Sequence, residues 1–131
     1  PTLGRQCGVP APETSEGIDL GAALRDPGAP GRPHLMFAYK DVQRAVRDDR
    51  WKLIRYPKVN MNQLFDLHAD PHETNNLAGL PAHAAKVAGL TALLASEQRK
   101  FGDTAPLQVP DPRPAGWSPP ARDSKAPRPP R

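Results

Sequence analysis

Proline is the residue that most constrains this chain. Of the 131 residues 18 are proline, and nine of these prolines fall in the last 27 residues, 105–131. Proline lacks a backbone N–H and fixes φ, so this tail cannot form a helix interior or a central strand. We expect the tail to be extended, as a strap over a parent domain, as a disordered segment or as a proline-rich recognition ligand.

The proline-poor part of the chain is short. Residue patterns typical of strands and helices lie in residues 34–104. The turn-rich segment 1–33 is expected to be a surface lead-in that packs through Ile18, Leu20 and Leu24. About 70 residues can build one small core, and the stability of such a core on its own is marginal. A segment of this length also excludes a large enzyme with its own deep cleft. No apolar run approaches the roughly 18–20 residues that a membrane span needs. Because the chain begins with Pro1 rather than Met, we expect an N-terminal part to be missing.

Charge and cysteine content narrow the possible functions. The net charge is +4, part of it belongs to the tail, and only seven residues are aromatic. A nucleic-acid surface needs clustered cations with interleaved aromatic side chains, so we expect no nucleic-acid partner. The single cysteine, Cys7, permits neither an internal disulfide nor a multi-cysteine zinc site. Cys7 has no activating base nearby in the sequence, so we interpret it as a buried or incidental thiol.

Four short runs have the length and composition of strands: residues 34–40, 42–47, 51–56 and 63–67. Asp48 and Asp49 separate the second and third runs, and Asp tolerates the positive φ of tight hairpin turns. Short connections favour an antiparallel sheet. Its buried side is expected to consist of Trp51, Leu53, Ile54, Leu64, Phe65 and Leu67.

Two helix starts follow the last predicted strand. Asp70 is expected to cap a single turn, with Pro71 at its first position, Glu73 reaching back to the cap, and Asn75 and Asn76 at a left-handed end. A longer helix is expected from Pro81 to Gly102. Its apolar stripe has spacings of three and four: Val87, Leu90, Leu94, Gln98 and Phe101. The fold class is therefore α+β, a four-stranded antiparallel sheet packed by one C-terminal helix.

Possible metal ligands are densest after the last predicted strand. They are Asp66, His68, Asp70, His72 and Glu73. The capped turn already accounts for Asp70, Pro71 and Glu73, so we expect no metal site in this chain.

A series of cations follows the predicted hairpin: Arg44, Arg47, Arg50, Lys52 and Arg55. It either binds anions or forms a solvated face balanced by Asp41, Asp48 and Asp49. The first interpretation gives an alternative function, a non-enzymatic basic module that binds anionic polymers.

Two motifs resemble the end of type I sulfatases, which are arylsulfatase-like members of the alkaline-phosphatase superfamily. Residues 45–54 (AVRDDRWKLI) are similar to the family pattern VRdgryKLI, and residues 64–77 (LFDLHADPHETNNL) are similar to LyDLxxDPxExxNLa. Residues 7–12 and 17–20 resemble the passage that precedes these motifs in the family.

The resemblance implies two domains with different roles. Sulfatases have a large α/β domain that carries the active site, and a small C-terminal subdomain with a four-stranded antiparallel sheet and a helix. They hydrolyse sulfate esters with a formylglycine made in C/S-x-P-x-R beside a calcium ion, and the family is expected in the periplasm or outside the cell. Cys7 is followed by Gly8-Val9-Pro10-Ala11 and does not fit that motif.

No catalytic residue or metal ligand of the family is therefore carried over. We expect a C-terminal fragment that is inactive alone and needs no cofactor. Its partner would be the missing N-terminal catalytic domain, and the full enzyme would act on a sulfated small molecule or glycan. Residues expected to reach substrate are Tyr39, Lys40, Gln43 and Arg44, and those expected to be structural are Asp66, Asp70, Pro71, Glu73 and Asn76.

Overall fold

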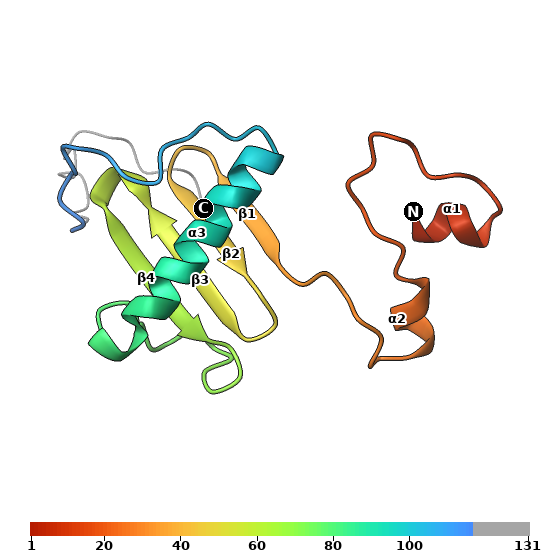
Figure 1. The fold of residues 1–131 in the computed structure, drawn as a ribbon, viewed down its shortest axis with the longest axis horizontal. Helices are drawn as coiled ribbons and strands as arrows, with labels where there is room; N and C mark the ends of the chain where they lie inside the picture. Colours follow the sequence, from red (N-terminus) through yellow and green to blue (C-terminus); the bar gives the residue numbers. More distant parts are fainter. Residues whose placement is uncertain (117–131) are drawn as a thin grey trace, which may run out of the picture.

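The structure is a computed structural model, and it describes residues 1–116. Four strands form one sheet, and one long helix follows them in the chain (Figure 1). The elements in order are α1 (Thr2–Gln6), α2 (Gly21–Arg25), β1 (Leu35–Tyr39), β2 (Gln43–Arg47), β3 (Trp51–Tyr56), the 3-10 helix η1 (Pro57–Val59), β4 (Met61–Asp66), the 3-10 helix η2 (Pro81–His83) and α3 (Ala84–Lys100).

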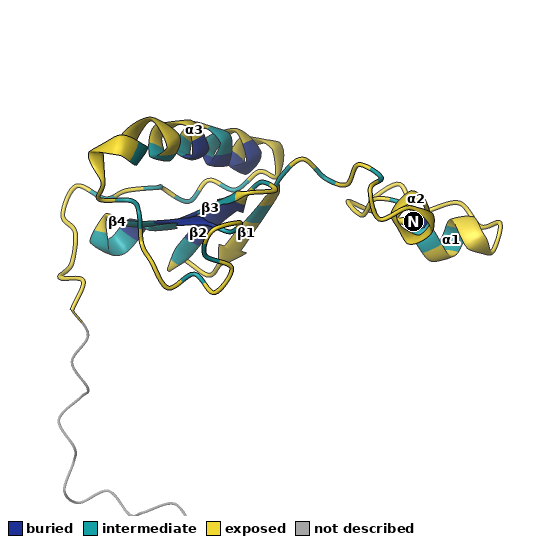
Figure 2. Ribbon diagram, turned by 90° about the horizontal axis from the view of Figure 1, so that it is seen from below, coloured by how far each residue is buried: buried dark blue, intermediate teal, exposed yellow. Residues whose placement is uncertain are grey.

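The sheet has the predicted topology. Its strands lie in the order β1-β2-β3-β4, and each neighbouring pair is antiparallel. Helix α3 lies along one face of this sheet (Figure 2), so the predicted α+β class is confirmed.

The turn between β2 and β3 forms where it was predicted, but for another reason. Arg47 pairs with Lys52 across the hairpin. The side chain of Asp48 accepts the backbone N–H groups of Arg50 at 2.9 Å and Trp51 at 2.6 Å. None of these residues has a positive φ. The aspartate therefore holds the turn through its carboxylate and not through a left-handed backbone.

The core lies between α3 and the sheet. Leu90 and Leu94, one helical turn apart, contact the fully buried side chains of Val46, Leu53 and Leu64. The predicted apolar stripe of α3 thus packs as expected at these two leucines. Five buried residues make a small core, which agrees with the size of the folded segment.

The predicted buried side of the sheet was partly wrong, because it combined two faces. Successive strand residues point to opposite faces, so Leu53 and Ile54 cannot both contact α3. Leu53 is fully buried under α3, whereas Ile54 is half-buried on the opposite face. Phe65 is buried but neighbours Leu64 and so also lies on the opposite face. Trp51 and Leu67 are only half-buried.

Helix α3 ends where glycine was predicted to stop it. Gly102 has a φ of +67°, and the N–H of Asp103 donates to the carbonyl of Gln98 at 2.8 Å. The last residue of the predicted stripe, Phe101, is exposed because it follows the end of the helix. Within residues 1–116, no helix combines the length and apolar character that crossing a membrane requires.

The first part of the proline-rich tail is a strap on this subdomain. Arg55 donates to the carbonyl of Leu107 at 2.8 and 3.1 Å. Asn60 and Val109 exchange two hydrogen bonds, at 2.7 and 2.9 Å. The recognition-ligand alternative depends mainly on residues 117–131, which lie outside the described residues.

The lead-in was expected to pack through Ile18, Leu20 and Leu24, and this expectation was wrong. These side chains are 40%, 50% and 69% exposed. The segment lies beyond β1, away from the main part of the sheet and α3 (Figure 1). Polar contacts hold it together, such as the N–H of Leu20 donating to the hydroxyl of Thr2 at 2.8 Å.

Candidate functional site

Three of the four predicted substrate contacts gather at the turn between β1 and β2. Tyr39 and Gln43 are paired in register, and Lys40 occupies the turn with a φ of +47°. The ammonium of Lys40 lies 5.7 Å from the centre of the Tyr39 ring. Tyr39 is 57% exposed. We call Tyr39, Lys40 and Gln43 the hairpin end.

Arg44 does not join this group. As the next residue after Gln43, it points to the opposite face of the sheet, and its side chain is only 7% exposed. Its Nε and Nη2 donate to the carboxylate of Asp103 at 2.5 and 3.1 Å. Its Nη1 donates to the carbonyls of Lys40 and Gln43. The Arg44 hydrogen bonds hold the pKa of Asp103 well below its usual range, so the pair is a charged structural clamp.

Most cations of the predicted series form salt bridges or hydrogen bonds with other residues of the chain. Its partnerships are Arg44 with Asp103, Arg50 with Asp66, Lys52 with Glu73, and Arg55 with the carbonyl of Leu107. Arg47 is exposed and donates to the carbonyl of Asp48. Within residues 1–116, the carboxylates that balance this series are Asp103, Asp66 and Glu73 and not the predicted Asp41, Asp48 and Asp49. The anion-binding alternative also involves the tail, most of which lies outside the described residues.

Asp66 joins the β2–β3 hairpin to the end of β4. Its carboxylate accepts the Nε of Arg50 at 3.0 Å and the Nη2 at 2.6 Å. It also accepts the backbone N–H groups of His68 and Ala69. The hydrogen bonds from Arg50, with help from the backbone, lower the pKa of Asp66 to about 2 against the opposing effect of burial.

The predicted capped helical turn at residues 70–73 is absent, and this expectation is corrected. Glu73 has a φ of +55°, which a helix does not allow. Its carboxylate accepts Lys52 Nζ at 2.6 and 2.9 Å instead of reaching back to Asp70. Asp70 closes a loop by accepting the N–H of Asn75 at 2.8 Å and the hydroxyl of Thr74 at 3.1 Å.

Together with Asn75, which also lacks a positive φ, Asn76 was expected to end that turn in a left-handed conformation, but its φ is not positive. Its Oδ1 accepts the N–H of Leu64 and the N–H of Ala78, both at 3.0 Å. The N–H of Leu77 donates to the carbonyl of Leu64 at 2.9 Å. Asn76 and Leu77 therefore cover the outer edge of β4, which would otherwise present unpaired backbone groups.

The possible metal ligands after β4 do not converge. Asp66, Asp70 and Glu73 each bind different groups of the chain, as described above. Among residues 1–116, no three His, Cys, Asp or Glu side chains are arranged to hold a metal ion. These residues do not fit the calcium site that the sulfatase resemblance implies for a full-length enzyme.

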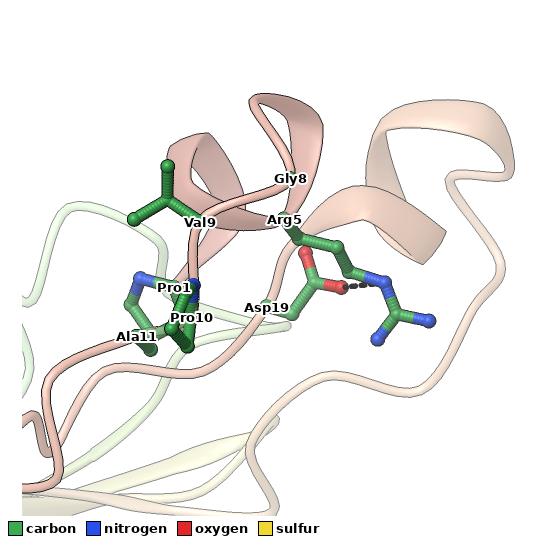
Figure 3. A pocket seen from close by; sticks show the side chains of 7 residues that line it. All are labelled: Pro1, Arg5, Gly8, Val9, Pro10, Ala11 and Asp19. Carbon is green, nitrogen blue, oxygen red and sulfur yellow. Dashed lines mark ion pairs between the residues drawn. The ribbon is translucent and has the colours of Figure 1, made fainter.

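A separate hollow of about 510 Å³ lies in the lead-in (Figure 3). Its lining residues are Pro1, Arg5, Gly8, Val9, Pro10, Ala11 and Asp19. Arg5 and Asp19 form an ion pair at 3.3 Å. The hollow contains no residue of the hairpin end, and the thiol of Cys7 is exposed beside it in the chain without lining it.

The sequence interpretation missed the partners that hold the sheet to the end of α3. Gln98 is buried, and its Nε2 donates to Asp103 at 3.0 Å and to the carbonyl of Ala105 at 2.9 Å. Arg44 and Asp103 lie 59 positions apart. No local pattern connects residues at that separation, although the strict alternation of strand residues separates Arg44 from Gln43.

Comparisons with known proteins relate this fold to sulfatases. The chain is 32% identical over 102 residues to a Delta 4,5-hexuronate-2-O-sulfatase of Bacteroides thetaiotaomicron, a match over 72% of this chain and 21% of the relative. It is 30% identical over 118 residues to an N-acetylglucosamine-6-O-sulfatase of the same organism, over 81% of this chain and 21% of the relative. The chain thus spans about a fifth of these relatives.

Solved structures show the same relation. A 2-O GAG sulfatase aligns with a TM-score of 0.67 and 30% identity, over 78% of this chain and 24% of that chain. A protein solved in complex with its substrate D-glucosamine-2-N,6-O-disulfate aligns with a TM-score of 0.66 and 26% identity, over 82% and 24%.

A family model covers most of the chain. The model described as N-sulphoglucosamine sulphohydrolase, C-terminal, matches residues 1–100. The predicted resemblance is thereby confirmed, and the chain belongs to this family of sulfatase C-terminal domains.

Proposed function

We propose that the chain is the C-terminal subdomain of a sulfuric ester hydrolase, that it completes the fold of a longer enzyme, and that its hairpin end lies at the rim of the substrate pocket. The observation that carries this proposal is the family match over residues 1–100 in a chain that spans a fifth of its relatives. The test is to read the DNA upstream of Pro1. An in-frame C/S-x-P-x-R supports the proposal, whereas a start codon close to Pro1 favours a free-standing module.

The relatives support a proposal for the substrate class. Two of them are a Delta 4,5-hexuronate-2-O-sulfatase and an N-acetylglucosamine-6-O-sulfatase, and one structure holds a disulfated glucosamine. We therefore propose a sulfated sugar as the substrate of the full-length enzyme. Formylglycine and calcium would be supplied by the preceding domain, since the described residues do not fit a calcium site.

One stretch of the tail has the spacing of the formylglycine motif. Residues 118–122 (SPPAR) have the spacing S-x-P-x-R, and they lie outside the described residues. A tail rich in proline and arginine produces this spacing readily. The string also follows the subdomain, at the opposite end of the chain from the expected catalytic domain. We assign Ser118 no catalytic role.

The isolated chain is therefore expected to hydrolyse no sulfate ester, because residues 1–116 hold no group of metal ligands beside which a nucleophile could act. An aryl sulfate assay with added calcium tests this, with the Ser118→Ala variant as control. Turnover that the Ser118→Ala change abolishes would overturn the assignment and give this chain a nucleophile of its own.

The hairpin end has groups suited to a sulfated sugar. The Tyr39 ring offers a stacking face, the Lys40 ammonium can bind sulfate oxygens, and the amide of Gln43 can hydrogen-bond hydroxyl groups. Arg44 is left out of the proposed rim because its donors are engaged with Asp103 and two carbonyls.

In the full-length enzyme, the Lys40→Ala variant is expected to lower kcat/KM by about tenfold, equal to roughly 1.4 kcal/mol of transition-state binding. The melting temperature should not change, because Lys40 is exposed in a turn. Lys86→Ala is the matched control, since Lys86 is an exposed cation of α3 beside Trp51. Equal kinetics for the two variants would remove the hairpin end from the rim.

A further inference from the structure

One face of the sheet is covered by α3, and the other carries exposed apolar side chains. Leu35, Phe37 and Tyr39 alternate along β1 and so share the face opposite α3. They are 39%, 48% and 57% exposed. We call this surface, with Ile54 on β3, the open face. In Figure 2 α3 lies on one side of the sheet, and no helix among the described residues covers the other side.

The apolar residues of the open face are contiguous across three strands. Phe37 is paired with Ala45, and Ala45 is paired with Ile54. Ala45 is 7% exposed, and Ile54 is half-buried. Cross-strand partners lie about 4.5–5.5 Å apart, so these side chains form one band. A contiguous apolar band on a protein surface marks a contact site.

Within the described part of the chain, the open face is covered by other residues at β4 but not at β1. On β4, Phe65 has the same orientation as Ile54 and is only 4% exposed. There, the salt bridge from Lys52 to Glu73 at 2.6 Å brings the segment after β4 toward the sheet. The β1 side has no such cover within residues 1–116, and the exposed fraction rises from Leu35 to Tyr39.

The lead-in indicates what covers the β1 side. The lead-in enters β1 directly, and its own apolar residues Ile18, Leu20 and Leu24 are exposed. The chain spans 21% of the relatives that it matches, so most of their length lies outside it. The lead-in and β1 thus present apolar side chains on the side from which a preceding domain would come.

We propose that the open face is the surface through which this subdomain packs against the catalytic domain that precedes it in the full-length polypeptide. The inference rests on the proposed function. It also supports the position of the hairpin end, because Tyr39 lies at the end of the row formed by Leu35 and Phe37. Docking through these two residues brings Lys40 and Gln43 to the boundary between the domains.

The test compares cysteine labelling at two exposed apolar positions. In a Cys7→Ser background, the Phe37→Cys and Leu80→Cys variants are made both in the 131-residue chain and in the full-length polypeptide. Leu80 is the matched control, because it is 49% exposed and lies before α3, outside the sheet. A maleimide should label both variants of the short chain. In the full-length polypeptide, labelling at position 37 should fall at least about tenfold while position 80 keeps its rate.

A second measurement uses charge instead of reactivity. Phe37→Glu should lower the melting temperature of the full-length polypeptide by several degrees, because it places a carboxylate in the interface. Leu80→Glu should leave the melting temperature unchanged. The far-UV circular dichroism of the short Phe37→Glu chain checks that the subdomain still folds.

Each outcome supports or overturns the inference. Equal labelling of both positions in the full-length polypeptide overturns docking, even if that polypeptide hydrolyses a sulfated sugar. Protection at position 37 without sulfatase activity supports docking and overturns the proposed function. Protection that rises with concentration in the short chain identifies a second copy as the occupant and overturns the inference. The absence of any upstream coding sequence overturns both proposals.

Discussion

The side chain of Asn76 takes the place of a fifth strand beside Leu64. Its Oδ1 accepts the N–H of Leu64 at 3.0 Å, and the N–H of Leu77 donates to the carbonyl of the same leucine at 2.9 Å. Leu64 is fully buried in the core. The last asparagine and leucine of the LyDLxxDPxExxNLa-like stretch therefore complete the outer edge of the sheet.

Asn76→Ala is expected to destabilise the subdomain by about 1–3 kcal/mol, because it leaves the buried N–H of Leu64 without an acceptor. Urea unfolding measures the change. Asn76→Asp retains the acceptor oxygen and should lose less stability. The neighbouring Asn75→Ala is the control, since Asn75 is exposed and takes part in this loop through its backbone N–H. Equal losses at positions 75 and 76 would contradict the edge role.

Asp103→Ala is expected to reduce the free energy of unfolding by about 1.5–3 kcal/mol, because it removes a charged acceptor from the buried Arg44 and from Gln98. Asp111→Ala, an exposed aspartate of the strap, is the control. In a full-length enzyme, any activity lost by Asp103→Ala or Arg44→Lys should follow the unfolded fraction. Lower kcat/KM at unchanged stability would return Arg44 to the substrate site.

The strand order, the hairpin position and the helix end were predictable because each depends on neighbours in the sequence. The Asp48 turn, the alternation in β3 and the glycine after α3 are local signals. Two of the errors have a clear physical source. The list of buried residues ignored the alternation that separates Leu53 from Ile54. The capping pattern at Asp70 gave way to the tertiary salt bridge between Lys52 and Glu73.

The candidate site was predictable only at the hairpin end. Register brings Tyr39 and Gln43 together, and a turn between the first two predicted strands already implies this proximity. The engagement of Arg44 depends on Asp103, which α3 brings back to β2 from 59 positions away. Contacts at such separation follow from packing and have no local signature.

The stability of the subdomain should fall between pH 4 and pH 2. Asp66 has a pKa of about 2 in the folded protein, lowered by Arg50, against about 3.9 in an unfolded chain. A carboxylate whose pKa is lower in the folded than in the unfolded protein stabilises the fold at pH values above its unfolded pKa. This contribution is lost as the pH falls toward the folded pKa.

Urea unfolding at several pH values, with Asp66→Asn as the comparison, isolates this contribution. The asparagine retains an oxygen for the N–H groups of His68 and Ala69 but carries no charge for Arg50. The difference between the two proteins should be largest above pH 4 and shrink toward pH 2. A difference that does not change with pH would show that the ion pair contributes nothing to stability.

Two glycines of the α3 region should respond in opposite directions to the same change. Gly89 lies in the interior of α3, Gly102 follows its end with a φ of +67°, and a Cβ at either position would meet nothing within 4 Å. Gly89→Ala should stabilise the subdomain by about 1 kcal/mol, because alanine favours a helix. Gly102→Ala should destabilise it by about 1–2 kcal/mol, because the left-handed conformation crowds a Cβ. Thermal unfolding followed by circular dichroism measures both variants. Since a Cβ at either site would clash with no neighbouring group, changes of the same sign would show that the backbone conformation at Gly102 does not set the end of α3.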